Sequence, residues 1–159
     1  MEATGLVDVL RASPFTVGLG GSERRRLASF AREVAAATDE VLIREGEPTP
    51  FLGIVTSGRV ALRMRLPGRL PITVMTVEPG DIIGWSAVLA PYRATSTVVA
   101  VEPTELIALD GAPLRLALES DEDLAAALYP RILRSVARRL EGTRLQLLDL
   151  FGQTEERAW

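Results

Sequence analysis

The sequence contains no cysteine, no histidine and no lysine, although it is 159 residues long. Without cysteine there are no disulfide bonds, no thiol catalysis and no sulfur-ligated metals. Without histidine the chain lacks the commonest general base and a principal metal ligand, and without lysine it cannot form Schiff bases. We therefore expect no enzyme, no metal site and no bound cofactor.

Long apolar runs and an excess of positive charge are missing as well. No apolar run approaches the roughly 18 residues that span a bilayer, and the first residues do not form a basic and apolar leader. The net charge of −3 gives no general attraction for nucleic acid. With 47% hydrophobic and 25% charged residues, the composition is that of one globular domain. The sequence thus predicts a cytoplasmic, single-domain protein over residues 1–159.

The chain divides into three stretches of different character. Residues 1–37 are expected to be helical, with an amphipathic second helix over residues 22–34. Residues 38–110 consist of short β-rich runs separated by glycine and proline, which is typical of an antiparallel sandwich or barrel. Residues 111–159 are expected to be helical again, with a long helix over residues 121–151 that opens on three acidic residues. The predicted fold class is mostly β with flanking helices.

Five short motifs follow one another along the chain: SPF at Ser13, IREGEP at Ile43, IVTSGRVAL at Ile54, VEPGDIIG at Val77 and ARRLEGT at Ala137. Their order and spacing resemble the cyclic-nucleotide-binding domain of bacterial regulators of the catabolite-activator type. The resemblance implies a double-stranded β-helix jelly roll with N-terminal helices and a long C-terminal helix. Those regulators normally continue into a helix-turn-helix DNA reader. Because few residues follow the long helix, we expect a stand-alone module that does not bind DNA directly.

The resemblance is most specific in residues 80–100, GDIIGWSAVLAPYRATSTVVA, which match the phosphate-binding cassette of that family. In the family, the cassette has a Gly-Glu pair on a short helical turn and, nine positions after the glutamate, an arginine that meets the cyclic phosphate. Here Gly84 keeps the glycine, but Trp85 stands in the glutamate position. Ala94 stands in the arginine position, with Arg93 one step earlier.

The cassette implies a candidate ligand site, with a cyclic nucleotide or another small anion as the ligand. Its members are Gly84, Trp85, Ser86, Ala87, Arg93, Thr95 and Ser96. Trp85 cannot accept a hydrogen bond from the ribose hydroxyl, because an indole N–H only donates. Its side chain either fills the pocket as part of the hydrophobic core or stacks on a ligand. Arg93 reaches the pocket if its loop shifts by one residue, whereas in a regular strand it points to the opposite face. The hydroxyl groups of Thr95 and Ser96 either contact the ligand or belong to ordinary strand and turn residues with no binding role.

The long helix carries a stripe at alternating intervals of four and three residues, which is typical of a seam between two helices. We call it the seam; its members are Tyr129, Leu133, Val136, Leu140, Thr143, Leu147 and Leu150. The stripe predicts a homodimer, and the resemblance implies the same two-fold pairing, with Thr143 at a position that touches the adenine in bacterial members. The alternatives are that the stripe packs against its own barrel or pairs with another protein.

The rest of this helix surface complicates the pairing. Arg139 and Arg144 are expected to face each other as like charges between two parallel helices. This repulsion predicts that the paired segment of the helices is short. Leu145, Leu148 and Phe151 add apolar surface outside the seam. We expect this end of the helix to dock on the N-terminal helix or on a protein partner of unknown identity.

Three functions fit the sequence. The first is a regulatory module that acts through protein contacts and in which ordinary cAMP binding is doubtful. The second is a genuine cAMP or cGMP receptor with a shifted phosphate arginine. The third is a structural dimeric adaptor that has no ligand.

Overall fold

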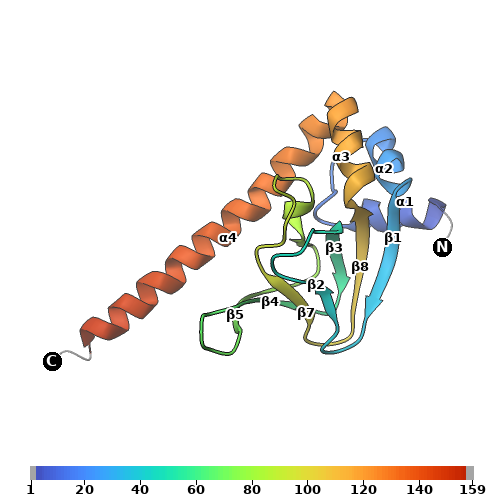
Figure 1. Ribbon diagram of the computed structural model, residues 1–159. Helices are drawn as coiled ribbons and strands as arrows, with labels where there is room; N and C mark the ends of the chain where they lie inside the picture. Colours follow the sequence, from blue (N-terminus) through green and yellow to red (C-terminus); the bar gives the residue numbers. More distant parts are fainter. Residues whose placement is uncertain (1–2, 157–159) are drawn as a thin grey trace.

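Two four-stranded antiparallel sheets form a jelly roll in the computed structural model, which describes residues 3–156 (Figure 1). The first sheet has the strand order β1-β8-β3-β6, and the second has the order β2-β7-β4-β5. The strands are β1 (Ala31–Ala36), β2 (Val41–Ile43), β3 (Phe51–Ser57), β4 (Val60–Met64), β5 (Ile72–Val77), β6 (Ile82–Ile83), β7 (Thr97–Ala100) and β8 (Thr104–Asp110). The antiparallel pairing within the described residues confirms the predicted jelly roll.

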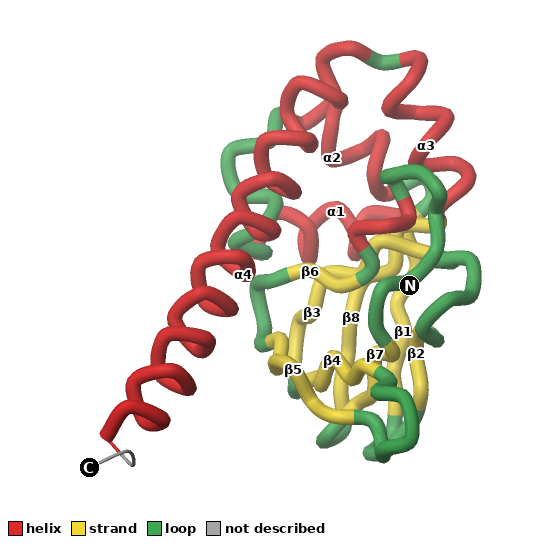
Figure 2. The backbone as a smooth tube through the Cα atoms, turned by 60° about the vertical axis from the view of Figure 1, so that its left-hand side comes forward, coloured by secondary structure: helices red, strands yellow, loops and turns green. Residues whose placement is uncertain are grey.

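Helices cover one side of this roll, and a long helix leaves it (Figures 1 and 2). They are α1 (Ala3–Ala12), α2 (Gly21–Ala28), the 3-10 turn η1 (Trp85–Ala87), α3 (Gly111–Ser120) and α4 (Glu122–Glu156). The Asp121 carboxylate accepts a hydrogen bond from the Leu124 N–H at 3.0 Å at the start of α4. The acidic start that predicted the long helix therefore includes a capping residue.

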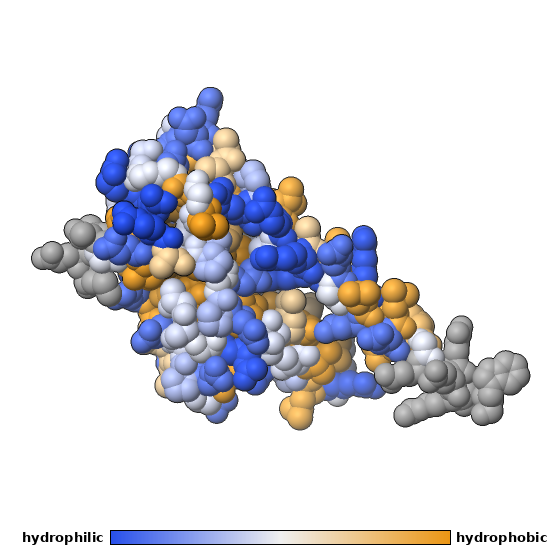
Figure 3. All heavy atoms as spheres, turned by 180° about the vertical axis from the view of Figure 1, so that it is seen from behind, coloured by the Kyte–Doolittle hydropathy of each residue, from blue (hydrophilic) through white to orange (hydrophobic). Residues whose placement is uncertain are grey.

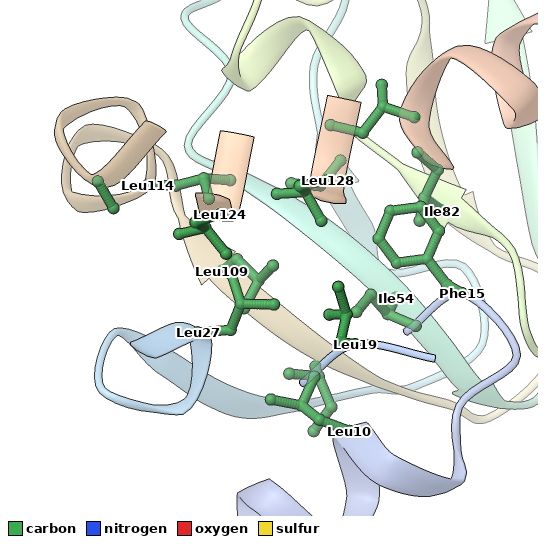
Figure 4. Packing of buried hydrophobic residues seen from close by; sticks show 14 of the residues in the cluster. Leu10, Phe15, Leu19, Leu27, Ile54, Ile82, Leu109, Leu114, Leu124 and Leu128 are labelled. Carbon is green, nitrogen blue, oxygen red and sulfur yellow. The ribbon is translucent and has the colours of Figure 1, made fainter. Parts of the chain in front are cut away.

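Apolar side chains form two cores, one inside the roll and one between the first sheet and the helices. The inner core joins the two sheets through residues such as Val55 and Leu106 from one and Leu62 and Val98 from the other. The outer core packs the helices on the sheet (Figure 4); its labelled members are Leu10, Phe15, Leu19, Leu27, Ile54, Ile82, Leu109, Leu114, Leu124 and Leu128. The start of α4 is thus anchored in the outer core.

The second half of α4 leaves the roll and projects from it (Figures 1 and 2). Leu124, Leu128, Ile132 and Ser135 are buried on the side that faces the domain. In contrast, every residue from 140 to 152 is exposed. The helix therefore has an anchored part and a part that makes little contact with its own domain.

The second predicted helix is wrong in its extent. Helix α2 ends at Ala28, and residues 31–36 form β1 instead of continuing the helix to Val34. Strand β1 pairs along its whole length with β8, from Ala31 opposite Leu109 onward. This long-range pairing outweighs the local apolar spacing that favoured a helix.

No helix within residues 3–156 has the combination of length and apolar character that a membrane crossing requires.

Candidate ligand pocket

Gly84 opens the cassette in a backbone conformation that other residues rarely adopt. It lies between β6 and η1 with a φ of 71° and a ψ of 34°, in the left-handed region. A Cβ atom at this position would lie 2.3 Å from the carbonyl oxygen of Phe51. Both the φ angle and the close approach of β3 require glycine here, so the family glycine has a structural reason to be present.

Ser86 and Ala87 are buried in the scaffold of the turn. The N–H of Ala87 donates to the carbonyl of Gly84 at 2.9 Å, which closes η1. The Ser86 and Thr49 hydroxyl oxygens lie 2.7 Å apart and form a hydrogen bond. The Arg115 guanidinium of α3 donates to the carbonyl of Ala87 at 2.8 Å. These bonds fix the cassette turn to the segment before β3 and to α3.

A small cavity of about 20 Å³ lies inside the cassette. Its lining residues are Ile43, Leu62, Gly84, Trp85, Ser86, Ala94, Thr95, Ser96, Val98 and Arg139. A space of this size holds about one water molecule. The fold therefore brings together five of the predicted site residues, but Ala87, Arg93 and Thr143 are not in the lining.

Trp85 forms one wall of this cavity and is half-buried. Its ring also packs against the outer core, between the first sheet and the helices. The indole is therefore partly core, as one of the two interpretations of this residue expected. No carboxylate takes its place in the cavity lining.

Arg93 lies outside the pocket. Its side chain is exposed, and its guanidinium donates to the carbonyl of Gly46 at 2.9 Å. Ala94 is 7% exposed, lines the cavity, and its N–H donates to the carbonyl of Glu47 at 2.9 Å. Successive side chains of extended backbone alternate between faces, so Ala94 points inward and Arg93 outward. The idea that a loop shift returns Arg93 to the pocket is wrong.

Arg139 of α4 is the one charged side chain in the cavity lining among the described residues. It lines the cavity, and its side chain is only 11% exposed. One terminal nitrogen donates to the carbonyl of Ile82 and lies 3.6 Å from Oδ2 of Asp81. Its Nε is buried and has no hydrogen-bond partner among the described residues. The expectation that Arg139 faces Arg144 at a helix seam is therefore wrong.

Burial lowers the pKa of the Arg139 guanidinium from its ordinary value. The nearby Asp81 carboxylate raises that pKa through its charge and a hydrogen bond, and Arg138 lowers it slightly further. An arginine remains protonated in proteins, so Arg139 stays a cation in a poorly solvated site.

Asp81 connects α4 to the start of β6 through several contacts. Its Oδ1 accepts a hydrogen bond from the Ser135 hydroxyl at 2.6 Å and lies 3.5 Å from a nitrogen of Arg138. The same oxygen accepts the N–H of Ile82 at 2.8 Å. We call Asp81, Ser135, Arg138 and Arg139 the latch. The latch holds α4 at the point where the helix passes the pocket.

The spacing of the domain-facing residues of α4 was the signal that locates Arg139. Leu124, Leu128, Ile132 and Ser135 are buried, and Arg139 follows at the next helical interval of four. The sequence analysis considered only the seam and predicted that Arg139 lies beside it. The position of Arg139 follows from a second stripe of α4, which is formed by the residues that face the domain.

The seam is mostly exposed in the single chain. Tyr129, Leu133, Leu140, Leu147 and Leu150 are 46% to 68% exposed, and Val136 is half-buried. The alternative that this stripe packs against its own domain holds only for Val136, which packs on the outer core; the other apolar members are exposed. Thr143 is exposed too, and its hydroxyl donates to the carbonyl of Arg139 at 2.9 Å. It belongs to the helix surface and is not part of the pocket in this chain.

A wide groove runs between the seam and β5. It has a volume of about 580 Å³. Its lining residues are Ile72, Thr73, Val74, Met75, Thr143, Gln146, Leu147, Asp149 and Leu150. Figure 3 shows apolar residues gathered on the projecting arm and on the neighbouring edge of the roll. The groove therefore has an apolar lining on both sides.

The jelly roll, the short turn that follows Gly84 and the long helix that passes the pocket define a regulatory module. The chain belongs to the cyclic nucleotide-binding domain family, whose model matches residues 33–121.

Two curated proteins are similar to this chain in sequence. The Acetyltransferase Pat of Mycolicibacterium smegmatis is 39% identical over 94 residues, which are 59% of this chain and 28% of that protein. The CRP-like cAMP-activated global transcriptional regulator of Mycobacterium tuberculosis is 29% identical over 143 residues, which are 90% of this chain and 62% of that protein. The chain thus spans only part of the curated relatives that it matches.

Among solved structures, a putative cyclic nucleotide-binding protein from Geobacter metallireducens has the same fold. It superimposes with a TM-score of 0.75 and 28% sequence identity, over 84% of this chain and 96% of that one. The match covers almost the whole of that chain, so the two chains share one fold.

Proposed function

We propose that this chain is a non-catalytic regulatory module that acts through protein contacts of α4, with a second copy of the chain as its partner. We further propose that its pocket does not take cAMP or cGMP in the manner of the family. The observation that carries the proposal is the exposure of the seam, whose apolar side chains are largely accessible to solvent where the helix leaves the domain.

The groove beside the seam supports a second copy as the partner. A helix that pairs through a seam places its own apolar side chains between those of the facing helix. The groove between β5 and α4 offers room of about 580 Å³ next to Leu147. Two copies related by a two-fold axis would each cover the seam of the other.

The contents of the pocket support the loss of ordinary nucleotide binding. Trp85 cannot accept a hydrogen bond from a ribose hydroxyl, and Ala94 brings no charge to a cyclic phosphate. The cavity of about 20 Å³ is far smaller than a usual pocket for a small organic ligand, which is several hundred Å³. Arg93, the residue on which the receptor hypothesis depends, lies outside.

A thermal titration with cAMP and with cGMP tests this proposal. We expect no saturable rise in Tm at about 1 mM of either nucleotide, because the pocket lacks the groups that bind one. A Kd of about 10 μM would instead stabilise the domain by about 2.7 kcal/mol, equivalent to about 5–10 °C in Tm. A rise of that size would contradict the proposal.

The small volume of the cavity also favours a second candidate, a dimeric adaptor that responds to no ligand. The two candidates differ in whether the pocket influences α4. For a regulatory module, Trp85→Ala should speed amide hydrogen exchange in α4 near the latch, since the indole packs on the outer core that anchors the helix. Arg93→Ala is the matched control, because that side chain is exposed. Equal exchange in α4 of both variants and the wild type would favour the adaptor.

A further inference from the structure

We propose that the hairpin between β4 and β5 docks on an anionic membrane surface, with arginines that contact the lipid phosphates and a leucine that enters the interface. The two strands pair antiparallel, and residues 63–71, RMRLPGRLP, form the end of the hairpin. We call these residues the hairpin tip. The hairpin tip is a different surface from the seam and the pocket, so its role is independent of the pairing through α4.

Positive charge without a neutralising partner is the first argument. The hairpin tip contains three arginines and no acidic residue, whereas the whole chain has a net charge of −3. Arg65 and Arg69 are exposed, and Arg63 is half-buried. None of these three forms an ion pair with a carboxylate of the described residues. The tip is therefore a local cationic surface on an acidic protein.

Exposed apolar side chains between these arginines are the second argument. Leu70 is 86% exposed, the highest value for a large apolar side chain in the described part of the chain. Met64 and Leu66 are exposed as well. A Cβ atom built at Gly68 would have no neighbour within 4 Å. The tip therefore extends into solvent, with apolar and cationic side chains interleaved along it.

Backbone hydrogen bonds hold the tip in a fixed shape. The N–H of Arg69 donates to the carbonyl of Leu66 at 3.2 Å, which closes a turn. Gly68 lies inside this turn with a φ of 68°, a conformation that favours glycine. The N–H of Arg65 donates to the Glu45 carboxylate at 3.0 Å, which ties the tip to the loop after β2. The tip therefore needs little ordering when it meets a partner.

A lipid surface fits this combination of side chains better than a nucleic acid does. The phosphates of a duplex attract arginines, but leucines at the same surface gain nothing from them. A bilayer interface accepts both groups, because apolar side chains are buried beside the acyl chains while arginines stay at the level of the phosphates. A protruding tip also needs no matching cavity in a lipid surface, whereas a protein partner would have to supply one.

The negative charge of the rest of the chain does not prevent this contact. Screening at physiological ionic strength limits interactions between exposed charges to about 8 Å. Figures 1 and 2 show the loop between β4 and β5 at the opposite end of the roll from α2, α3 and the acidic start of α4. The arginines of the tip therefore dominate the potential at the surface that the tip touches.

Co-sedimentation of the full chain with lipid vesicles tests this inference. We expect the wild type to bind vesicles of phosphatidylcholine and phosphatidylglycerol in equal amounts, and to dissociate as salt is raised. Vesicles of phosphatidylcholine alone should bind far more weakly. Arg65→Gln with Arg69→Gln should weaken binding to the mixed vesicles about thirtyfold, since each arginine near an anionic surface contributes about a factor of five. Leu70→Ala should weaken it about tenfold through lost apolar burial.

Each variant has a matched control at the opposite end of the molecule. Arg25→Gln with Arg26→Gln removes the same charge from α2, where both arginines are exposed. Leu116→Ala shortens a leucine of α3 that is 66% exposed. Both controls should leave vesicle binding within about twofold. Because all of these side chains are exposed, every variant should keep the circular dichroism of the wild type.

Absence of binding to the mixed vesicles would overturn the inference. Equal weakening by the two arginine pairs would assign binding to total charge, and an unchanged affinity in Leu70→Ala would exclude insertion; each result also overturns it. Binding to duplex DNA but not to vesicles would contradict it in favour of a nucleic-acid surface. Loss of a dimer in the tip variants would contradict it by placing the tip in the pairing interface. Sedimentation equilibrium measures that mass separately, so failure here is distinguishable from failure of the pairing through α4.

Discussion

Replacing Leu140 and Leu147 together by glutamate is expected to separate the two chains of the proposed dimer into monomers. The pair places four carboxylates at the centre of a two-fold seam, where they repel each other and lose water. Leaving charges buried and unpaired costs several kcal/mol, so the dimer Kd should rise by about a thousandfold or more. Size-exclusion chromatography with light scattering gives the molar mass directly.

The matched control changes the same kind of residue on the same helix. Leu145→Glu with Leu148→Glu alters two leucines that are 63% and 66% exposed but lie outside the seam. This variant should remain dimeric. Because all four leucines are exposed in the single chain, both variants should keep the circular dichroism of the wild type. Equal loss of the dimer in both variants would show that α4 associates through its general apolar character and not through the seam.

Trp85→Glu combined with Ala94→Arg is expected to create a cAMP-binding protein. The glutamate provides an acceptor for the ribose hydroxyl, and the arginine provides a charge for the cyclic phosphate. Ala94 already points into the cavity, so the new guanidinium starts on the correct face. At about 100-fold excess of cAMP over Kd, the double variant should gain about 2.7 kcal/mol of stability. The measurement is the Tm with and without ligand, supported by calorimetric titration.

The single variants are the controls for this restoration. Trp85→Glu alone lacks the phosphate charge and Ala94→Arg alone keeps the indole at the sugar site, so each should bind cAMP far more weakly than the pair. Without ligand, the double variant should be less stable than the wild type, because it buries two charges in a small space. A folded double variant that binds no cAMP would contradict the claim that these two positions explain the altered pocket.

Local patterns in the sequence predicted the parts of the fold that depend on them. Alternating short runs and turn glycines gave the β-roll, and the acidic start at Asp121 gave α4, which the Asp121 carboxylate caps. Strand β1 was missed because its six residues have the apolar spacing of a helix and become a strand only by pairing with β8. Such pairing depends on residues far along the chain, as Ala31 with Leu109 and Ala36 with Thr104, and no local pattern reports it.

The sequence located the residues of the cassette but left open on which side of the chain Arg93 lies, and it did not predict the conformation of Gly84. Gly84 is in the left-handed conformation, and the alternation of the extended chain puts Ala94 inside and Arg93 outside. Arg139 was not predicted as a pocket residue, because it lies in α4, far along the chain from the cassette. It lines the pocket only because α4 packs against the jelly roll. The site is therefore composite, and a motif within one segment describes only part of it.

Sedimentation equilibrium of the wild-type protein at micromolar concentration, without any nucleotide, tests the central claim most directly. We expect twice the mass of one chain, because a second copy would cover the exposed seam of α4. A single-chain mass across the whole concentration range would contradict the account.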